Sequence, residues 1–349
     1  MTSARPHPAR RALLISIAGA ILTLGAACIS LMSGPVSLPL PDVLRALLSW
    51  TGLMEKDMSA MARDIVLLVR LPRTVLAALA GGALSVAGAV FQVLLRNVLA
   101  EPYILGVSSG AAVGALIAMS TGIAALFWGA IPLSAFLGAS LVVGVVHILA
   151  RARAQNDSNT LLLVGVMVGA FLSAIILALV STVGDPVRNA LFWLLGYLGH
   201  ATPATISIVA PVVLLVCGIL FVKSHTLNVL ALGDEQASHL GLDARRVSLL
   251  LYLAASMLTA SVVSFSGSIG FVGLIIPHLL RRTAGPDHRV LLPGAFFFGA
   301  AFLIISDIVA RSVLSPVELP VGAVTAALGA PVFIWMLWKG DGLGSAKLD

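Results

Sequence analysis

Hydrophobic residues in this 349-residue chain lie in long uncharged blocks separated by short polar segments. The first block covers residues 12–32, and no Asp, Glu, Lys or Arg occurs between Pro102 and Ala150. A helix needs about 20 apolar residues to cross a bilayer, and several blocks reach that length. The pattern predicts an all-α polytopic membrane protein.

Ten membrane-spanning helices fit these blocks. The expected spans are 12–32, 74–95, 106–120, 131–150, 160–183, 203–222, two within 247–280, 290–311 and 321–338. The stretch 247–280 is ambiguous, because Ser266-Gly267-Ser268 interrupts it and it could form one long tilted helix or two. A short extra helix could lie in the segment that contains Asp185, Arg188 and His200.

The distribution of positive charge resolves the ambiguity, since Lys and Arg accumulate in cytoplasmic loops. With ten spans and a cytoplasmic N-terminus, 14 of the 21 Lys and Arg residues lie inside, whereas nine spans leave only 10 inside. We therefore expect one ten-span domain over residues 1–349 with both termini in the cytoplasm. Residues 1–11 then form a cytoplasmic tail, 33–73 an outer loop and 230–246 an inner loop.

Composition excludes other classes. Hydrophobic residues make up 59% of the chain and charged residues 10%, against about 25% charged in soluble domains, so a soluble enzyme is ruled out. The basic pI of about 9.9 reflects one side of a membrane rather than nucleic-acid binding. Cys28 and Cys217 lie in apolar stretches, which argues against disulfides or a Cys metal site. Residues 10–28 resemble a lipoprotein signal, but the apolar run continues past Cys28 and favours a span.

Few side chains within the predicted spans carry chemistry. Asp307 lies one turn before Arg311, and an i,i+4 salt bridge is favoured over a proton-coupling site. We interpret His147 as structural and Gln92 as a hydrogen-bonding link between helices. Small residues predict close helix contacts in the second span, and they are Gly81, Gly82, Ser85 and Gly88.

The chain contains no visible energy source. It has no G-x-x-x-x-G-K-[ST] phosphate loop, no HExxH, no Gly-x-Ser-x-Gly and no His/Asp/Glu cluster with metal-ligand spacing. Energy must come from an ion gradient or from another subunit. The polar inner loop from Leu230 to Arg246, LALGDEQASHLGLDARR, predicts a short amphipathic helix, which could be a docking element or a solvated connector.

Several separated motifs resemble those of the FecCD-type permeases, which belong to iron-chelate, heme and cobalamin ABC importers. In chain order they are RLPRTVLAALAGGALSVAGAVFQVLLRNVLAEPYILGVSSGAAVGA from Arg70, WLLG at Trp193, LGDEQASHLG in the inner loop, GSIGFVGLIIPHLLR from Gly267, DHRVLLPG from Asp287, SDIVAR from Ser306 and ELPVGAVTAALGAPVF from Glu318. The resemblance extends from about residue 70 to the end of the chain. It is especially close to the cobalamin and heme permeases.

The resemblance implies the transmembrane subunit of a type II ABC importer in a bacterial inner membrane. The expected partners are a second copy of the chain in a homodimer, two cytoplasmic ATP-binding-cassette subunits and a periplasmic substrate-binding protein, with no nucleic acid. Such a chain is not an enzyme and binds no metal or cofactor, because ATP and Mg²⁺ belong to the partner ATPase. The expected cargo is a ferric siderophore, heme or cobalamin.

The resemblance also assigns residues. Arg70, Arg73 and Arg311 correspond to arginines that face carboxylates of the binding protein, although they could simply anchor helix ends at the headgroups. ATPase coupling is expected from Gly233, Asp234, Ala237 and Gly241. The cytoplasmic gate would comprise Asn97, Leu99, Ser158 and Asn159. The translocation path would be lined from spans 5 and 10, including Gly165, Met167, Gly169 and Phe171.

At some positions the roles implied by the resemblance do not carry over directly to this sequence. Val98 stands where the family has proline, which predicts a more flexible gate loop. His278 matches a family histidine whatever the cargo, so we interpret it as structural, and His200 is a weak candidate to meet an incoming chelate. The main alternative is a proton-coupled secondary transporter, which needs essential carboxylates in the spans. A membrane-embedded enzyme is a second alternative, without a catalytic constellation to support it.

Overall fold

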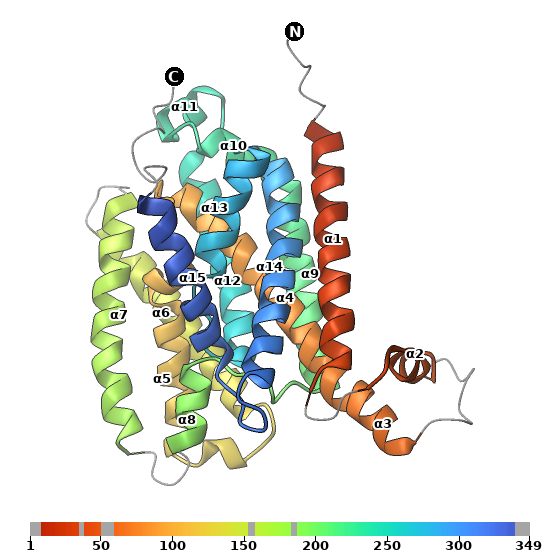
Figure 1. Ribbon diagram of the computed structural model, residues 1–349. Helices are drawn as coiled ribbons and strands as arrows, with labels where there is room; N and C mark the ends of the chain where they lie inside the picture. Colours follow the sequence, from red (N-terminus) through yellow and green to blue (C-terminus); the bar gives the residue numbers. More distant parts are fainter. Residues whose placement is uncertain (1–7, 35–37, 50–58, 153–157, 183–186, 339–349) are drawn as a thin grey trace.

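The computed structural model describes residues 8–34, 38–49, 59–152, 158–182 and 187–338, and within these ranges the chain is a bundle of helices (Figure 1). Seven helices in the described part are long and apolar enough to cross a membrane. They are α1 (Pro8–Met32), α4 (Leu71–Leu94), α6 (Ala130–Ala152), α7 (Ser158–Val180), α9 (Pro203–Val222), α12 (Ala244–Ser266) and α14 (His288–Ser312).

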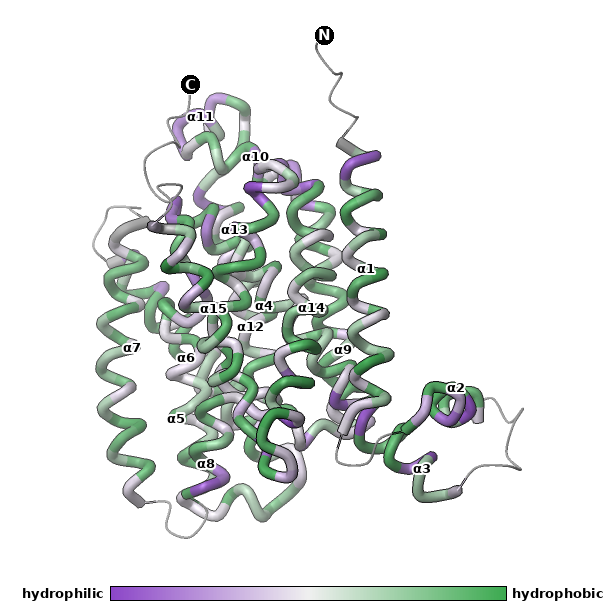
Figure 2. Tube along the Cα trace, in the orientation of Figure 1, coloured by the Kyte–Doolittle hydropathy of each residue, from purple (hydrophilic) through white to green (hydrophobic). Residues whose placement is uncertain are grey.

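Three shorter helices occupy the remaining predicted segments. They are α5 (Val107–Ser120), α13 (Val272–Ala284) and α15 (Val321–Trp338). Ten helices therefore coincide with the ten segments expected from hydrophobicity. Hydrophobic residues follow the helices along their length, and hydrophilic residues gather toward their ends (Figure 2).

The ambiguous stretch 247–280 forms two helices. α12 ends at Gly267, whose φ of +66° lies in the left-handed region that glycine adopts without steric cost. A Cβ at this position would overlap the carbonyl oxygen of Trp193. The chain then passes through 268–270 to Phe271, at φ +69°, and α13 begins at the next residue. The long helix α12 and the short helix α13, joined by a sharp reversal, therefore form in place of one tilted helix.

α4 forms the centre of the bundle. In its most apolar window 89% of residues are buried, against 11% in α1 and α7, which lie at the periphery. The predicted small-residue contacts of α4 are confirmed, because a Cβ at Gly81 would overlap the backbone of Gly299 and one at Gly88 the backbone of Gly273. Close backbone approach of this kind drives helix association in lipid.

Short elements connect the long helices at the two ends of the bundle. They are α2 (Leu40–Ser49), α3 (Ala60–Asp64), the π-helical η1 (Ile65–Arg70), η2 (Pro102–Leu105), η3 (Ile123–Ala125), α8 (Val187–Leu194), α10 (Ser224–Leu230) and α11 (Asp234–His239). The first turn of α1, the last turn of α15, α10 and α11 share one end, here called the α11 end (Figure 1). α8 marks the opposite end, the α8 end, and is the short extra helix expected near Arg188.

Helix occupies part of the predicted outer loop 33–73. α3, η1 and α4 form a continuous helix from Ala60 to Leu94. Arg70 and Arg73 therefore lie inside a helix rather than at its mouth. Parts of the predicted tail and outer loop, residues 1–7 and 50–58, lie outside the described residues.

Candidate functional site

Two sets of polar side chains lie at opposite ends of this apolar bundle. At the α8 end, Arg73 from the first turn of α4 binds two carboxylates. Its Nε and Nη2 donate to Asp307 of α14 at 3.0 and 2.9 Å, and its Nη1 donates to both oxygens of Glu318 at 3.0 Å. The guanidinium also lies over the Tyr197 ring, 5.8 Å from its centroid. Arg73 thus joins α4 to α14 and to the segment before α15.

Two more arginines at this end, Arg70 and Arg311, bind the last turn of α1 and the residue after it. Arg311 donates to the carbonyl oxygen and hydroxyl of Ser30, each at 2.7 Å, and to the carbonyl of Ser33 at 3.0 Å. Arg70 donates to the carbonyls of Leu31 and Met32 at 2.8 and 3.1 Å. Carbonyls at a helix C-terminus have no partners within the helix, so cations are favoured there.

The expected salt bridge between Asp307 and Arg311 is confirmed at 3.5 Å, but Arg73 is the closer partner of Asp307. Arg70, Arg73 and Arg311 are only 5%, 7% and 5% exposed. Their contact with a binding protein stays a prediction. Because the three side chains are buried, a partner could bind them only by displacing the hydrogen bonds that they make within the chain. Glu318 is the most accessible carboxylate of the network, with 27% of its side chain exposed.

The second set of side chains is on and around α11, the short helix expected in the inner loop. Gly233 and Gly241 bracket it with positive φ angles of +111° and +81°. Ala237 is fully buried and faces the chain's own helices, so it is not available to a partner on the free surface. The exposed side of α11 carries polar residues. Leu232, before the helix, and Leu240, after it, are 50% and 65% exposed.

The predicted gate loop lies beside α11. Arg96, which ends the turn after α4 at φ +46°, forms an ion pair with Asp234 of α11 at 2.8 Å. The Asn97 side chain accepts a hydrogen bond from the Leu99 N–H at 2.8 Å, a local turn that orders the loop without the family proline. Ser158 and Asn159 lie in the first turn of α7, and their side chains are outside the described residues.

Glu101 is a buried carboxylate that the sequence analysis did not single out. It follows the gate loop and accepts the backbone N–H of Phe271 at 2.5 Å, which fixes the reversal before α13. Burial raises the pKa of Glu101 to about 7, although the hydrogen bond from the Phe271 N–H opposes this shift. The available signal was an acidic residue directly before Pro102 in a chain with few acidic residues.

The four residues expected along the path divide between two sides of α7. Gly165 is buried against Ile104 and Leu105, and Gly169 lies close to Gly106, so both face η2 and α5. Met167 and Phe171 are 65% and 68% exposed. Only the second pair is open to a partner or a substrate in the isolated chain.

Gln92 and His147, the other polar side chains singled out in the predicted spans, contact neighbouring helices. Gln92 donates to the Gly273 carbonyl at 3.2 Å and accepts from Arg281, which confirms its expected link between helices. The rings of His147 and Tyr252 lie 5.9 Å apart. The part of the chain that the structure describes contains no group of three or more His, Cys, Asp or Glu residues arranged to hold a metal.

A hydrogen-bonded clamp joins α10 to the start of α14. The Asn228 side chain donates to Asp287 and accepts the His288 N–H, both at 2.8 Å. Hydrogen bonds from Arg289 and Asn228 hold the pKa of Asp287 below its usual range, although its partial burial opposes them. The carboxylate therefore stays ionised and keeps the clamp closed at neutral pH.

The fold and the placement of charge define a multi-pass helical membrane protein whose polar groups cluster at the ends of the bundle. The chain belongs to the FecCD transport family, which it matches over residues 21–339.

Curated relatives are permease proteins. The chain is 40% identical to the cobalamin import system permease protein BtuC of Halobacterium salinarum, over 91% of this chain and 84% of the relative. It is 38% identical to the uncharacterized ABC transporter permease protein YvrB of Bacillus subtilis, over 90% and 89%. Identity to the hemin transport system permease protein HmuU of Yersinia pestis is 38%, over 78% and 82%.

A solved structure shares the fold. It is described as an inward-facing conformation of a putative metal-chelate type ABC transporter, and it superposes with a TM-score of 0.81 at 30% identity. The match covers 93% of this chain and 99% of the solved chain. The overall arrangement of helices is therefore that of an ABC transporter permease.

Proposed function

We propose that this chain is the permease subunit of an ATP-driven type II ABC importer for a metal chelate, heme or cobalamin. The observation that carries the proposal is the ion pair of Arg96 with Asp234, which joins an exposed polar helix to the loop beside it. An importer of this kind needs an element that binds the ATPase and transmits its movement to an inner loop. The relatives named for cobalamin and hemin transport support the cargo class.

In this proposal all ten helices cross a bacterial inner membrane, with the α11 end in the cytoplasm and the α8 end in the periplasm. The excess of Lys and Arg on the α11 side supports this orientation. α13 has only 13 residues, about 20 Å at 1.5 Å per residue, so it crosses only because residues 267–271 return into the bundle.

A second copy of the chain would complete the pathway. α7 and α15 both carry large apolar side chains that nothing covers in the single chain. The most exposed of these are Met167, Phe171, Leu177, Ile334 and Trp338. A homodimer that pairs these helices across a central path would place Met167 and Phe171 at its wall, as expected for a large chelate that must be released after binding.

The two ends of the bundle would then bind different partners. Two ATPases would contact the exposed sides of the two α11 helices, including Leu232 and Leu240 at their ends. A binding protein would deliver cargo to the α8 end, where Glu318 is the accessible member of the buried ionic network. Its carboxylates would compete with Glu318 for Arg73.

ATP-driven closure of the ATPases would displace α11, and two contacts would transmit that displacement. The ion pair of Asp234 with Arg96 leads to the gate loop, and Glu101 at the end of that loop leads to the start of α13. The clamp of Asn228 on Asp287 leads from α10 to α14. One path begins at α11 and the other at α10, and both end on helices that contact α4.

The test is uptake into proteoliposomes containing the chain with its ATPase and binding protein. Labelled ferrichrome, heme and cobalamin are compared with ATP, without ATP and with a collapsed proton gradient. We expect uptake of one cargo that requires both ATP and the binding protein. Uptake that does not require ATP would instead establish the proton-coupled transporter, if it is lost when the proton gradient is collapsed and also lost in Asp307→Asn.

A further inference from the structure

We propose that a cavity at the α11 end binds the phosphate group of an anionic phospholipid. The cavity has a volume of about 720 Å³ and lies between the last turns of α6, the first turns of α7 and α12, and α11. Its lining includes three arginines, Arg151, Arg245 and Arg246, together with the rings of His147 and Tyr252. The bound headgroup would be a structural ligand rather than the transported cargo.

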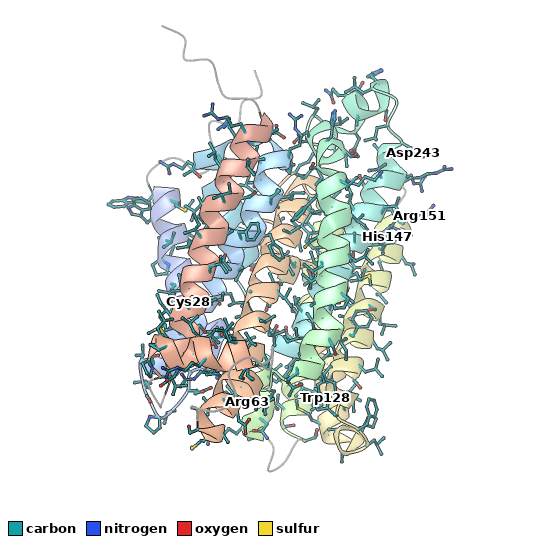
Figure 3. All side chains as sticks on the ribbon, turned by 90° about the vertical axis from the view of Figure 1, so that its right-hand side faces the viewer. Cys28, Arg63, Trp128, His147, Arg151 and Asp243 are labelled. Atoms are coloured by element: carbon teal, nitrogen blue, oxygen red, sulfur yellow. The ribbon has the colours of Figure 1, made fainter. Side chains whose placement is uncertain are left out.

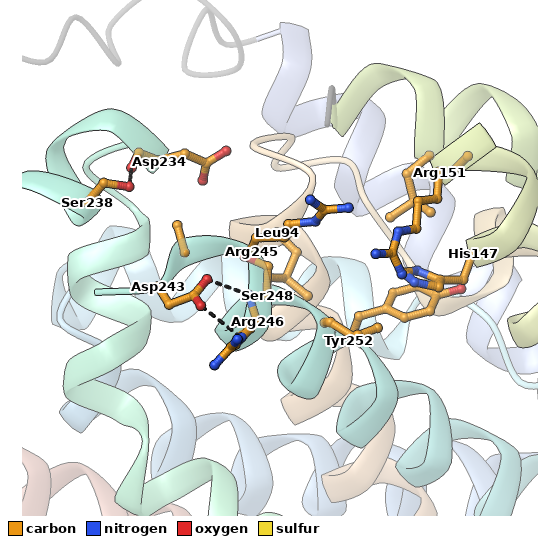
Figure 4. A pocket seen from close by; sticks show the side chains of 14 residues that line it. Leu94, His147, Arg151, Asp234, Ser238, Asp243, Arg245, Arg246, Ser248 and Tyr252 are labelled. Carbon is orange, nitrogen blue, oxygen red and sulfur yellow. Dashed lines mark hydrogen bonds and ion pairs between the residues drawn. The ribbon is translucent and has the colours of Figure 1, made fainter. Parts of the chain in front are cut away.

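The charges around the cavity are not balanced. Two carboxylates also line it, but Asp243 pairs with Arg246 at 3.0 Å and Asp234 pairs with Arg96 at 2.8 Å. Arg151 and Arg245 form no ion pair or side-chain hydrogen bond within the described residues. Figure 4 shows their guanidinium groups directed into the cavity from opposite walls. Two unpaired guanidiniums facing one space form a site for an anion.

Phosphate suits this pair of arginines. A guanidinium is a planar donor whose parallel N–H groups match two oxygens of a phosphate, and it remains charged at any physiological pH. The rings of His147 and Tyr252 also line the cavity, 5.9 Å apart in a tilted arrangement, and the Tyr252 hydroxyl already donates to the Val143 carbonyl at 3.3 Å.

The position of the cavity favours a lipid as the source of the phosphate. On α6, Ile148 and Leu149 lie within one turn of Arg151 and are 66% and 49% exposed. On α12, Leu250 lies one turn beyond Arg246 and is 66% exposed. Figure 3 shows His147 and Arg151 near the α11 end of the bundle. A phosphate held by the arginines would leave acyl chains beside these leucine and isoleucine side chains.

The placement of this lipid in the cytoplasmic leaflet rests on the orientation proposed above, but binding itself does not depend on transport. Basic cavities between helices on the cytoplasmic side are typical sites for anionic headgroups. The test is native mass spectrometry of the purified full chain in detergent. The chain is titrated with phosphatidylglycerol or with phosphatidylcholine of the same acyl length.

We expect phosphatidylglycerol to bind more tightly than phosphatidylcholine, and Arg151→Gln or Arg245→Gln to weaken its binding about fivefold each. Arg10→Gln is the matched control, because it removes an exposed arginine from the same end without touching the cavity. Thermal unfolding of each variant identifies any that fail to fold. Arg151→Gln and Arg245→Gln test the site independently, so one of them still reports lipid binding if the other does not fold.

Three results would overturn the proposal. The first is equal binding of the two lipids, and the second is an equal loss in Arg10→Gln and Arg245→Gln. The third is displacement of phosphatidylglycerol by millimolar inorganic phosphate, which would assign the cavity to a soluble anion. Loss of transport with lipid binding intact would instead count against the importer and leave this site unaffected.

Discussion

Arg73 binds two carboxylates at the α8 end. Its guanidinium binds both Asp307, whose side chain is 1% exposed, and Glu318, whose side chain is 27% exposed. A buried charge without its partner is far more costly than an exposed one, because it loses hydration without compensation. The two carboxylates of the network should therefore differ sharply in their contributions to stability.

Asp307→Asn should destabilise the protein by about 3–5 kcal/mol, because it leaves Arg311 buried without a counter-charge and weakens the bonds of Arg73. Glu318→Gln should cost about 1 kcal/mol or less, since that side chain is partly solvated. Thermal unfolding in detergent, followed by tryptophan fluorescence or by size-exclusion chromatography, compares them. Equal shifts in the two variants would show that Asp307 is not the central acceptor.

Glu101 fixes the start of α13 through one hydrogen bond to the Phe271 N–H. Glu101→Ala leaves that buried donor unsatisfied and should cost about 1–3 kcal/mol, whereas Glu101→Gln keeps an acceptor and should cost less. Because Arg96 lies in the adjoining loop and is about half exposed, trypsin cleavage after Arg96 reports the order of the loop. Faster cleavage is expected in the alanine variant, and unchanged cleavage in both variants would contradict this role.

The packing of α4 against its neighbours requires glycine at two positions, Gly81 and Gly88. Its contacts with α13 and α14 place backbone against backbone at Gly88 and Gly81. Dispersion between closely packed helices is the main attraction available in lipid, where burial of apolar surface gives no advantage. The glycines of α4 consequently act on packing rather than on backbone conformation.

Gly88→Ala should destabilise the bundle by about 1–3 kcal/mol, because the new methyl group meets the rigid backbone of Gly273. Gly144→Ala in α6 is the matched control, since no atom lies within 4 Å of the added carbon. Thermal unfolding in the same detergent compares the two. A Gly144→Ala variant as unstable as Gly88→Ala would mean that helix flexibility, not packing, matters.

At the scale of the whole molecule, an exposed ion pair between Arg96 and Asp234 joins the gate loop to α11. Arg96 and Asp234 are 48% and 53% exposed, so their contact adds little to stability, about 0–1 kcal/mol. Its value in the proposed importer is geometric, because it makes the loop follow α11. Stability and coupling should therefore respond differently when it is removed.

Arg96→Gln should leave folding and ATPase assembly intact but lower the uptake per ATP hydrolysed about two- to thirtyfold, the range of 0.5–2 kcal/mol in coupling energy. Uptake and phosphate release are measured on the same proteoliposomes. Arg45→Gln is the control, because it removes a similarly exposed ion pair, to Asp42 at 3.0 Å, far from α11 in α2. An unchanged ratio in Arg96→Gln would exclude this contact from coupling.

The sequence by itself determined the segments of the bundle. The uncharged blocks placed the helices to within a few residues, and the Lys and Arg bias favoured two helices over one in 247–280. The polar inner loop predicted α11, because solvation preference is a local property of the chain. Gln92 was also placed correctly, since an amide in an apolar helix needs a partner. Charge bias added the orientation, which stays a prediction.

Only the tertiary structure decided which polar groups meet. Arg73 and Asp307 are 234 positions apart, and Glu101 and Phe271 are 170 apart, so no local pattern pairs them. The same holds for the two sides of α7, because the rotation of a uniformly apolar helix is set by its neighbours rather than by its own periodicity. Hydrophobicity fixes what enters the membrane, and packing fixes which side chains face each other there.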